Sequence, residues 1–315
     1  PQEWSWCSGY NHSDSTVIGF AHTQLSGTGI GDLHDITVMP VVGEVTYSRG
    51  KVNDAKSGLW SYQDRKREVA QAGDYATHLT RYNIEVELTA TSRTGLHRYT
   101  FPQSNDAAIV VDLENGGGWD EVTSSCITVV NDTTIVGHRR SHGWSGNHVV
   151  YFKAVFSRPF KAAHLISNNT EINDTQLYDT AVYGRFDFDT SDGEKIQMKV
   201  GTSVTSIEGA SLNLAAEQEG WEFEKVRNDA IAAWNEQLKK VEIGTDDESV
   251  KRIFYTAMYH TMIQPNVVSD VDGRYVNADY ETKRMAEGRR YYSTFSLWDT
   301  FRAAHPLYNL IAPDI

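Results

Sequence analysis

The spacing of hydrophobic and polar positions divides the chain into two parts. Up to about residue 210, apolar and polar residues alternate in short runs separated by glycine, Asn-Asp or Ser-Asp-Gly turns. The clearest runs cover residues 83–91, 107–113, 126–130, 134–137, 149–156, 183–188 and 197–204. Alternation with a period of two is typical of half-buried strands. Many short strands with no helices between them predict an antiparallel β-sandwich over residues 1–212.

Beyond the sandwich, the hydrophobic period lengthens to that of a helix. Four apolar residues recur at every fourth position: Val226, Ala230, Trp234 and Leu238. Charged residues lie between them, so these four residues form one face of an amphipathic helix. We therefore expect a linker helix over residues 213–242.

The last part of the chain, residues 243–315, predicts further helices. Apolar and small residues line one face with helical spacing: Ile253, Ala257 and Thr261. They predict a helix over residues 249–262, preceded by acidic residues that complement its N-terminus. Another helix is expected over residues 296–311, although Pro306 lies within it. The expected fold class is therefore a β-sandwich followed by α: a sandwich, a linker helix and the start of an α domain.

Composition mainly excludes classes of protein. The 315-residue chain has a formal net charge of −13. An acidic surface repels phosphate backbones, so we expect no nucleic-acid partner. No run of eighteen apolar residues occurs, so we expect no membrane span. The two cysteines, Cys7 and Cys126, can form one disulfide or remain two buried thiols.

Two motifs invite a ligand-binding interpretation but fit neither pattern fully. The glycines of residues 26–31 lead to Asp32, where a dinucleotide fingerprint needs a third glycine. We interpret this segment as a tight glycine loop. Residues 268–273 resemble half of a calcium loop, but Val268 and Asp279 would occupy its first and twelfth positions. An Asp-Gly turn in a short hairpin is the simpler interpretation.

The strongest local cluster of chemistry-bearing residues is Trp298, Asp299 and Arg302. A Trp beside an Asp can stack against a sugar face while the carboxylate accepts two hydroxyl hydrogens. The same residues also suit a helix start, with the Trp in the core and the Asp capping the helix or pairing with Arg302. No zinc-site spacing occurs. We interpret three histidines as ordinary hydrogen-bonded residues: His22, His34 and His138.

Several segments together resemble glycoside hydrolase family 92, a family of calcium-dependent exo-acting α-mannosidases. They are residues 6–32, residues 95–102, Gly143-Trp144, residues 270–275, and residues 295–302 with 305–307. Their order matches the family, and the match extends over nearly the whole chain. The combination is far more specific than any one motif, and it favours sugar contact for Trp298 and Asp299.

The resemblance implies an N-terminal β-sandwich, linker helices and an (α/α)6 barrel that meet at a pocket for one terminal mannose. It implies a secreted, periplasmic or cell-surface enzyme that removes terminal α-linked mannose from mannans or N-glycans. In that family a Glu is the general acid, an Asp is the base, configuration inverts, and a calcium ion is bound. The implied substrate-binding residues are Trp6, Gly29 and Asp32 in the sandwich, and Trp298, Asp299 and Arg302 in the helical part.

A complete barrel does not fit into residues 243–315. Twelve helices of ~11 residues with ~5-residue loops need about 190 residues. We therefore expect a truncated barrel, with the acid, the base and most calcium ligands beyond Ile315. The alternative is a non-catalytic carbohydrate-binding sandwich whose aromatic platform consists of Trp4, Trp6, Trp119 and Trp144. The linker helix and the Trp298-Asp299 segment weigh against that alternative. A second alternative is another two-domain sugar hydrolase or phosphorylase built from a sandwich and a barrel, whose motifs the sequence does not match.

Overall fold

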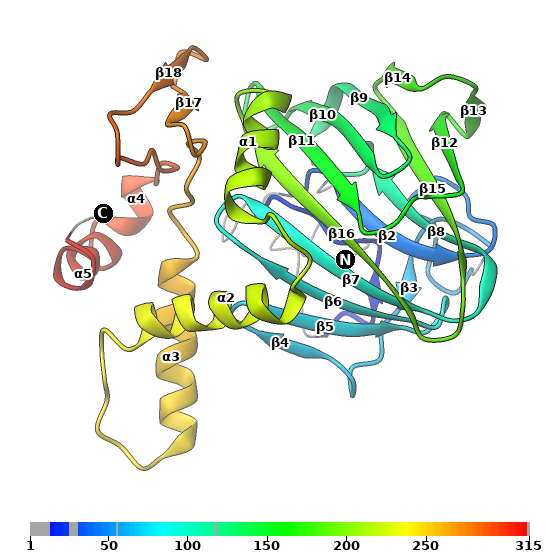
Figure 1. Ribbon diagram of the computed structural model, residues 1–315. Helices are drawn as coiled ribbons and strands as arrows, with labels where there is room; N and C mark the ends of the chain where they lie inside the picture. The colour runs from blue at the N-terminus through cyan, green and yellow to red at the C-terminus, as the bar shows by residue number, and fades with distance from the viewer. Residues whose placement is uncertain (1–12, 25–30, 55, 117–118, 314–315) are drawn as a thin grey trace.

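The computed structural model describes residues 13–24, 31–54, 56–116 and 119–313. Two β-sheets form a sandwich, and the helices extend from one side of it (Figure 1). Every pair of neighbouring strands in the two sheets is antiparallel.

The larger sheet has nine strands, in the order β14 (Gln176–Asp179), β9 (Glu121–Asn131), β10 (Thr134–His142), β11 (His148–Phe156), β16 (Glu194–Ser203), β7 (Thr94–Phe101), β6 (Ile84–Ala90), β5 (Asp74–Leu79) and β4 (Val69–Gln71). The smaller sheet has five, in the order β13 (Thr170–Ile172), β12 (Ala162–Ser167), β15 (Val182–Thr190), β8 (Ser104–Asp112) and β2 (Thr37–Val42). A separate pair joins β1 (Thr16–Val17) to β3 (Ser61–Tyr62).

One hydrophobic core lies between the two sheets because alternate residues of each strand point inward. In β6, Ile84 and Val86 are fully buried, whereas Glu85 between them is partly exposed. Phe152 of the larger sheet and Phe186 of the smaller one are both fully buried in this core. The predicted antiparallel sandwich followed by helices is confirmed.

The linker region contains two helices, so the prediction of one continuous helix over residues 213–242 is wrong. The first helix, α1 (Ile207–Glu217), begins before the predicted start, and α2 (Phe223–Leu238) follows a non-helical segment. Ser206 is the N-cap of α1, because its Oγ accepts a hydrogen bond of 3.0 Å from Gly209 N.

A lysine of the sandwich explains the break between α1 and α2. Lys199 Nζ donates to the carbonyl oxygen of Gln218 at 3.1 Å and to that of Glu219 at 2.7 Å. These carbonyls therefore have a partner outside the helix. Gly220 follows them, and glycine has the poorest helix propensity after proline. The helical period visible in the sequence belongs to α2 alone.

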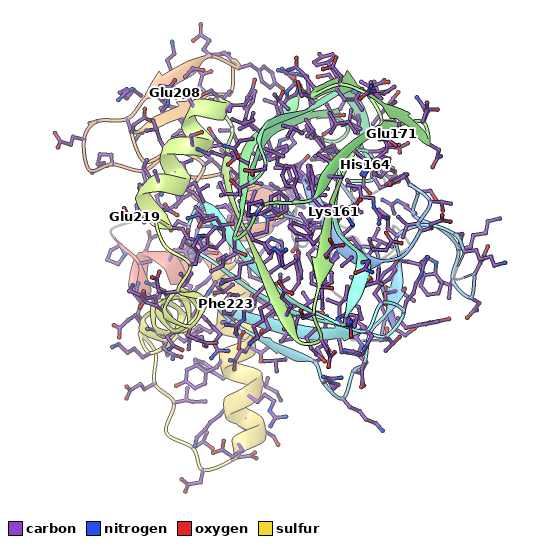
Figure 2. All side chains as sticks on the ribbon, turned by 45° about the vertical axis from the view of Figure 1, so that its right-hand side comes forward. Lys161, His164, Glu171, Glu208, Glu219 and Phe223 are labelled. Atoms are coloured by element: carbon purple, nitrogen blue, oxygen red, sulfur yellow. The ribbon has the colours of Figure 1, made fainter. Side chains whose placement is uncertain are left out.

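The α2 helix lies against β5 and β6 of the larger sheet. Its first residue, Phe223 (Figure 2), is buried. The Arg98 guanidinium lies 4.0 Å from the ring centroid of Phe223. Farther along α2, the rings of Trp234 and Tyr259 lie 4.8 Å apart and join it to α3 (Glu248–Met262). The predicted second helix is therefore confirmed as α3.

The predicted helix over residues 296–311 is divided into α4 (Leu297–Thr300) and α5 (Ala304–Ile311), so the prediction of one helix is wrong. In a continuous helix, Pro306 would remove an internal hydrogen bond and clash with the preceding turn. In the structure it lies in the first turn of α5, where N–H groups have no intrahelical partner. Among the described helices, none has the length and apolar character needed to cross a membrane.

Between α3 and α4 the chain forms a hairpin of β17 (Arg274–Val276) and β18 (Thr282–Arg284). The hairpin is present as predicted, but the Asp-Gly pair is not its tip. A hydrogen bond of 2.9 Å from Gly273 N to Asp270 O closes a turn that leads into β17. Residues 277–281 connect the two strands instead.

The buried side chain of Asp270 anchors this hairpin to the sandwich. Its carboxylate accepts hydrogen bonds from Ser203 Oγ at 2.9 Å and from Asn213 Nδ2 at 2.7 Å. Next to it, Arg93 Nε donates to Ser269 O at 2.6 Å. These bonds join β16, α1 and the turn before β17, and they therefore fix the hairpin relative to the sandwich.

Candidate functional site

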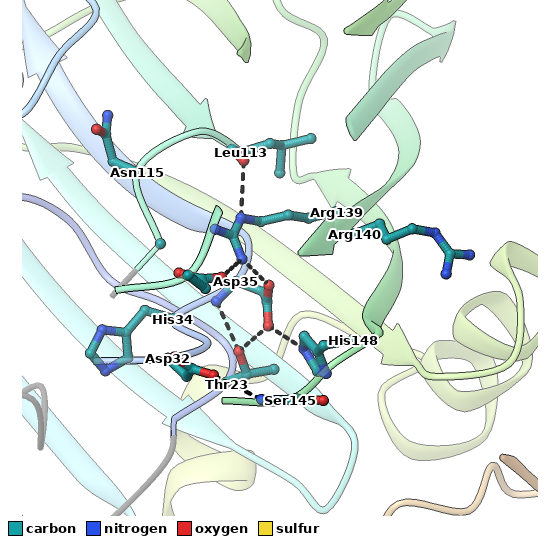
Figure 3. A network of polar contacts seen from close by, with 12 residues as sticks. Thr23, Asp32, His34, Asp35, Leu113, Asn115, Arg139, Arg140, Ser145 and His148 are labelled. Carbon is teal, nitrogen blue, oxygen red and sulfur yellow. Dashed lines mark hydrogen bonds and ion pairs between the residues drawn. The ribbon is translucent and has the colours of Figure 1, made fainter. Parts of the chain in front are cut away.

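A buried network of charged side chains lies where β9 begins and β10 ends (Figure 3). Arg139 of β10 is its centre. Its Nη1 lies 2.6 Å from Asp35 Oδ1 and 2.7 Å from Asp120 Oδ2, and its Nε donates to Leu113 O at 3.0 Å. Arg139 occupies an inward-facing position of its strand, so its guanidinium is fully buried between the sheets.

Asp35 is held ionised by the groups around it. Its Oδ2 accepts hydrogen bonds from Thr23 Oγ1 at 2.6 Å and from His148 Nε2 at 2.7 Å. Burial would raise the pKa of Asp35, but His148 and Arg139 outweigh it and hold that pKa well below its ordinary value. For His148, burial by itself would lower the pKa. The Asp35 carboxylate outweighs this effect and raises the pKa of His148 above its ordinary value.

With His148 protonated, the network contains two cations and two anions: Arg139 and His148 against Asp35 and Asp120. Desolvated charges are stable only when they are balanced and hydrogen-bonded. The network meets both conditions, and it ties together three loop regions that are distant in the sequence.

Asp32 lies next to this network and is 2% exposed. Its Oδ2 accepts a hydrogen bond of 3.1 Å from Ser145 N. Its Oδ1 has no hydrogen-bond partner among the described residues, and neither have Asp120 Oδ1, Arg139 Nη2 and His34 Nε2. Because buried polar atoms are nearly always paired, such a group of unpaired atoms marks a place that a ligand can complete. Hydroxyl groups can do so, since they both donate and accept.

The loop of residues 143–147 approaches Asp32 directly. A Cβ at Gly143 would lie 2.7 Å from Asp32 Oδ1 and 3.0 Å from Asp120 Cβ. No ordinary Cβ makes contacts this short, so only glycine fits at this position. The next residue, Trp144, projects from the same loop and is 73% exposed. The loop that carries this exposed aromatic ring therefore borders the buried polar network.

Comparison with known families identifies both parts of the chain. Residues 1–203 match the glycosyl hydrolase family 92 N-terminal domain, and residues 209–315 match the glycosyl hydrolase family 92 catalytic domain. The chain belongs to glycosyl hydrolase family 92. The resemblance found in the sequence is therefore confirmed, and the two matches meet between β16 and α1.

Solved structures resemble this family 92 chain over most of its length. A family GH92 alpha-mannosidase from Bacteroides thetaiotaomicron is 33% identical with a TM-score of 0.92, covering 97% of this chain and 42% of that one. That mannosidase has also been solved in complex with mannoimidazole. A family GH92 inverting mannosidase from the same species is 25% identical with a TM-score of 0.75, covering 89% of this chain and 36% of that one.

A relative from Arthroderma benhamiae is described as an uncharacterized secreted glycosidase. It is 25% identical over 296 residues, which are 82% of this chain and 36% of that protein. This family 92 chain thus spans about two fifths of the length of these relatives.

The site residues predicted from the sequence lie in separate parts of this family 92 chain. Asp32 lies next to the network, whereas Trp6 and Gly29 lie outside the described residues. Trp298 and Asp299 belong to α4, and Arg302 follows it. Among the described residues, no hydrogen bond or ion pair joins α4 to the network. The structure therefore places Asp32 beside the network, whereas a role of the α4 residues at the same sugar stays a prediction.

The structural roles considered for the α4 residues are absent from the described part of the chain. Trp298 is 85% exposed and is not a core residue. The N-cap is Ser296 rather than Asp299. No ion pair joins Asp299 to Arg302, whose guanidinium lies 5.2 Å from the Phe301 ring centroid instead. These side chains are accessible to a ligand.

Sequence reasoning missed most of the network, including Asp35, Asp120, Arg139 and His148. One signal was available, because Arg139 falls on the inward positions of its strand, where apolar residues are expected. A charged residue at such a position needs buried partners. Sequence distance conceals those partners.

The three predicted ordinary histidines have different environments. His22 Nδ1 lies 2.7 Å from Ile36 O, and His138 Nε2 lies 3.2 Å from Ser124 Oγ, as expected of hydrogen-bonded residues. His34 departs from that expectation, because its buried Nε2 has no partner among the described residues. Of the two cysteines, Cys126 is a buried free thiol, and Cys7 lies outside the described residues.

The described residues do not form a calcium site. They contain no group of three or more His, Cys, Asp or Glu side chains placed to hold a metal ion. Asp32 and Asp120 each offer an oxygen without a partner among the described residues, but Arg139 Nη2 lies beside Asp120 and would repel a cation there.

Proposed function

We propose that this chain is part of an exo-acting α-mannosidase that removes terminal α-linked mannose from mannans or N-glycans. The observation that carries the proposal is the similarity of 97% of the chain to a family GH92 alpha-mannosidase, at a TM-score of 0.92 and 33% identity. The mannoimidazole complex of that relative adds support for a mannose-type ligand.

In this proposal, residues of both domains bind the terminal mannose. Asp32 Oδ1, which has no hydrogen-bond partner among the described residues, accepts a sugar hydroxyl, while Trp298 is exposed and stacks against a sugar face. Asp299 accepts hydrogen bonds from two neighbouring hydroxyls, and Arg302 orients its carboxylate once the sugar is bound. Trp6 and Gly29 are proposed to line the sandwich side of the same pocket.

Inversion, a calcium requirement and an extracellular or periplasmic location complete the proposal. One relative is described as an inverting mannosidase and another as a secreted glycosidase. We expect the general acid, the general base and the calcium ligands in the part of the catalytic domain beyond Ile315, because this chain covers only 42% of the solved mannosidase. When bound, calcium supplies a hard cation that coordinates sugar oxygens.

The test uses the full-length protein with α-1,2-mannobiose, and with 4-nitrophenyl α-glucoside as the control substrate. We expect mannose release that a calcium chelator abolishes, with β-mannose as the first product in proton NMR spectra because configuration inverts. The 315-residue chain alone is expected to be inactive. A full-length protein that binds mannan and releases no mannose would instead support a carbohydrate-binding module.

A further inference from the structure

An exposed aromatic side chain of the hairpin reaches the loop that carries another exposed aromatic side chain, next to the buried network. Trp144 is 73% exposed and Tyr280 is 56% exposed. Trp144 lies in the loop after β10, and Tyr280 lies at the tip of the β17–β18 hairpin. A Cβ at Gly146 would lie 3.7 Å from Tyr280 Oη, so the hairpin tip touches the loop that carries Trp144.

The loop that carries Trp144 is rigidly held. Ser145 N donates to Asp32 Oδ2 at 3.1 Å, and Gly143 N donates to Ser145 O at 3.0 Å. The Nδ1 of His142 lies 2.8 Å from Gly146 O and closes the loop on its other side. Burial of a large apolar ring is stabilising, and the ring on this ordered loop can be buried only when a ligand or another surface covers it. The geometry therefore favours a ligand at this ring.

The backbone of Tyr280 adopts an unfavourable conformation. Its φ is 61°, in the left-handed region that residues other than glycine rarely adopt. Asn277 maintains this conformation, because its Oδ1 accepts hydrogen bonds from Asp279 N at 3.0 Å and from Glu281 N at 2.8 Å. Backbone strain of this kind persists where the surrounding structure enforces it, and such places are often binding sites.

We propose that Trp144 and Tyr280 form a subsite for the neutral sugar unit next to the terminal mannose, an inference that rests on the proposed function. Each ring combines an apolar face with a polar edge, as pyranose recognition requires. Residues 143–147 carry no charged side chain, which suits an uncharged ligand. Asp32 links the two subsites, because one of its oxygens holds the Trp144 loop and the other has no partner in the part of the chain that the structure describes.

The test compares a substrate with one sugar and a substrate with three, in the full-length protein. α-Mannosyl fluoride occupies only the terminal-mannose site, whereas α-mannotriose extends beyond it. For Trp144→Ala and Tyr280→Ala, we expect kcat/KM on mannotriose to fall roughly tenfold, mainly through KM, by loss of the apolar surface that the rings bury. We expect kcat/KM on the fluoride to stay within about twofold of the parent value.

Two controls make the result specific. Tyr178→Ala removes another exposed aromatic ring, 66% exposed on β14, and should change neither substrate. Trp144→Phe keeps an aromatic face and should retain most activity on mannotriose. Unchanged kinetics on mannotriose, or equal losses on both substrates, would overturn the subsite. A parent protein that acts on neither substrate would overturn the proposed function and this inference with it.

Discussion

Asn213 Nδ2 donates a hydrogen bond of 2.7 Å to Asp270 Oδ1, and Asn213 Oδ1 accepts one of 2.8 Å from Val271 N. A single buried amide thus joins α1 to the turn that precedes β17. The hairpin that carries Tyr280 follows that turn, so the placement of the proposed subsite depends on this amide.

Replacing Asn213 should therefore weaken the attachment of the hairpin. Asn213→Ala leaves a buried carboxylate oxygen and a backbone N–H without partners, and we expect the free energy of unfolding to fall by about 2–3 kcal/mol. Urea unfolding of the full-length protein measures this loss. The matched control is Asn235→Ala on the exposed surface of α2, which should change stability by less than about 0.5 kcal/mol. Equal losses for the two variants would contradict the role of Asn213.

Removing the guanidinium at the centre of the network should be among the most destabilising single changes. Arg139→Met leaves the buried carboxylates of Asp35 and Asp120 without their shared cation, for a loss of about 3–5 kcal/mol. The guanidinium of the neighbouring Arg140 points outward and donates to Asn147 Oδ1 at 2.5 Å, so Arg140→Met should cost less than about 1 kcal/mol. Denaturant unfolding of the two variants compares these costs. A small loss for Arg139→Met would show that the network relaxes or fills with water.

The pair of His148 and Asp35 should make stability depend on pH. The folded-state pKa of His148 is raised, so its contribution is complete below about 6.5 and is lost as the pH rises through the folded value. The folded-state pKa of Asp35 is lowered, so its contribution is complete above about 3.9 and is lost as the pH falls. The difference in the free energy of unfolding between the parent and His148→Gln should therefore be largest between about pH 4 and 6.5. A stability difference that grows at pH 8.5 would contradict this assignment.

Two other buried histidines should act in the opposite direction. The Nε2 atoms of His22 and His97 lie 2.9 Å apart, and His22 Nδ1 must donate to Ile36 O, which can only accept. Neutral His22 then accepts at Nε2 from His97, whose Nδ1 accepts from Tyr99 Oη at 2.7 Å. Both rings are therefore neutral in the folded protein, and burial lowers the pKa of His22 to about 4.

As the pH falls from about 6.5 to 4, His22 binds a proton in the unfolded chain but stays neutral in the folded protein. The parent should lose stability relative to His22→Gln, by up to about 1.4 kcal/mol per pH unit. Thermal unfolding of both proteins at several pH values in this range measures the slope. Parallel curves for parent and variant would show that His22 becomes protonated without cost in the folded state.

Asp299→Ala tests the proposed sugar contact in α4. Charge-assisted hydrogen bonds contribute roughly 1.5–3 kcal/mol each, and about 1.4 kcal/mol corresponds to tenfold. We expect kcat/KM of the full-length protein on mannobiose to fall about ten- to several hundredfold. Asn309→Ala, an exposed change on α5, is the control and should keep parental activity. A folded Asp299→Ala protein with parental kcat/KM would exclude this carboxylate from the sugar site.

Features that depend on neighbouring residues could be predicted from the sequence, whereas features that depend on contacts between distant segments could not. Residues 83–91 alternate because successive side chains of a strand face opposite sides, and they form β6. The break between α1 and α2 could not be placed from periodicity, because it depends on Lys199 of a neighbouring strand, which binds the carbonyls that follow α1. Hydrophobic periodicity reflects only the local secondary structure and the buried face of a segment, and it contains no information on contacts with distant segments.

The sequence by itself determined the β-then-α order, the helical face of α2 and, through its combined motifs, membership of family 92. Only the tertiary structure decided which charges meet. Arg139 and Asp35 are 104 residues apart, and His22 and His97 are 75 residues apart. Their contacts depend on strand order and register in two packed sheets. A local pattern reports which side of a strand is buried, but the partner of a buried charge is set by the element packed against it.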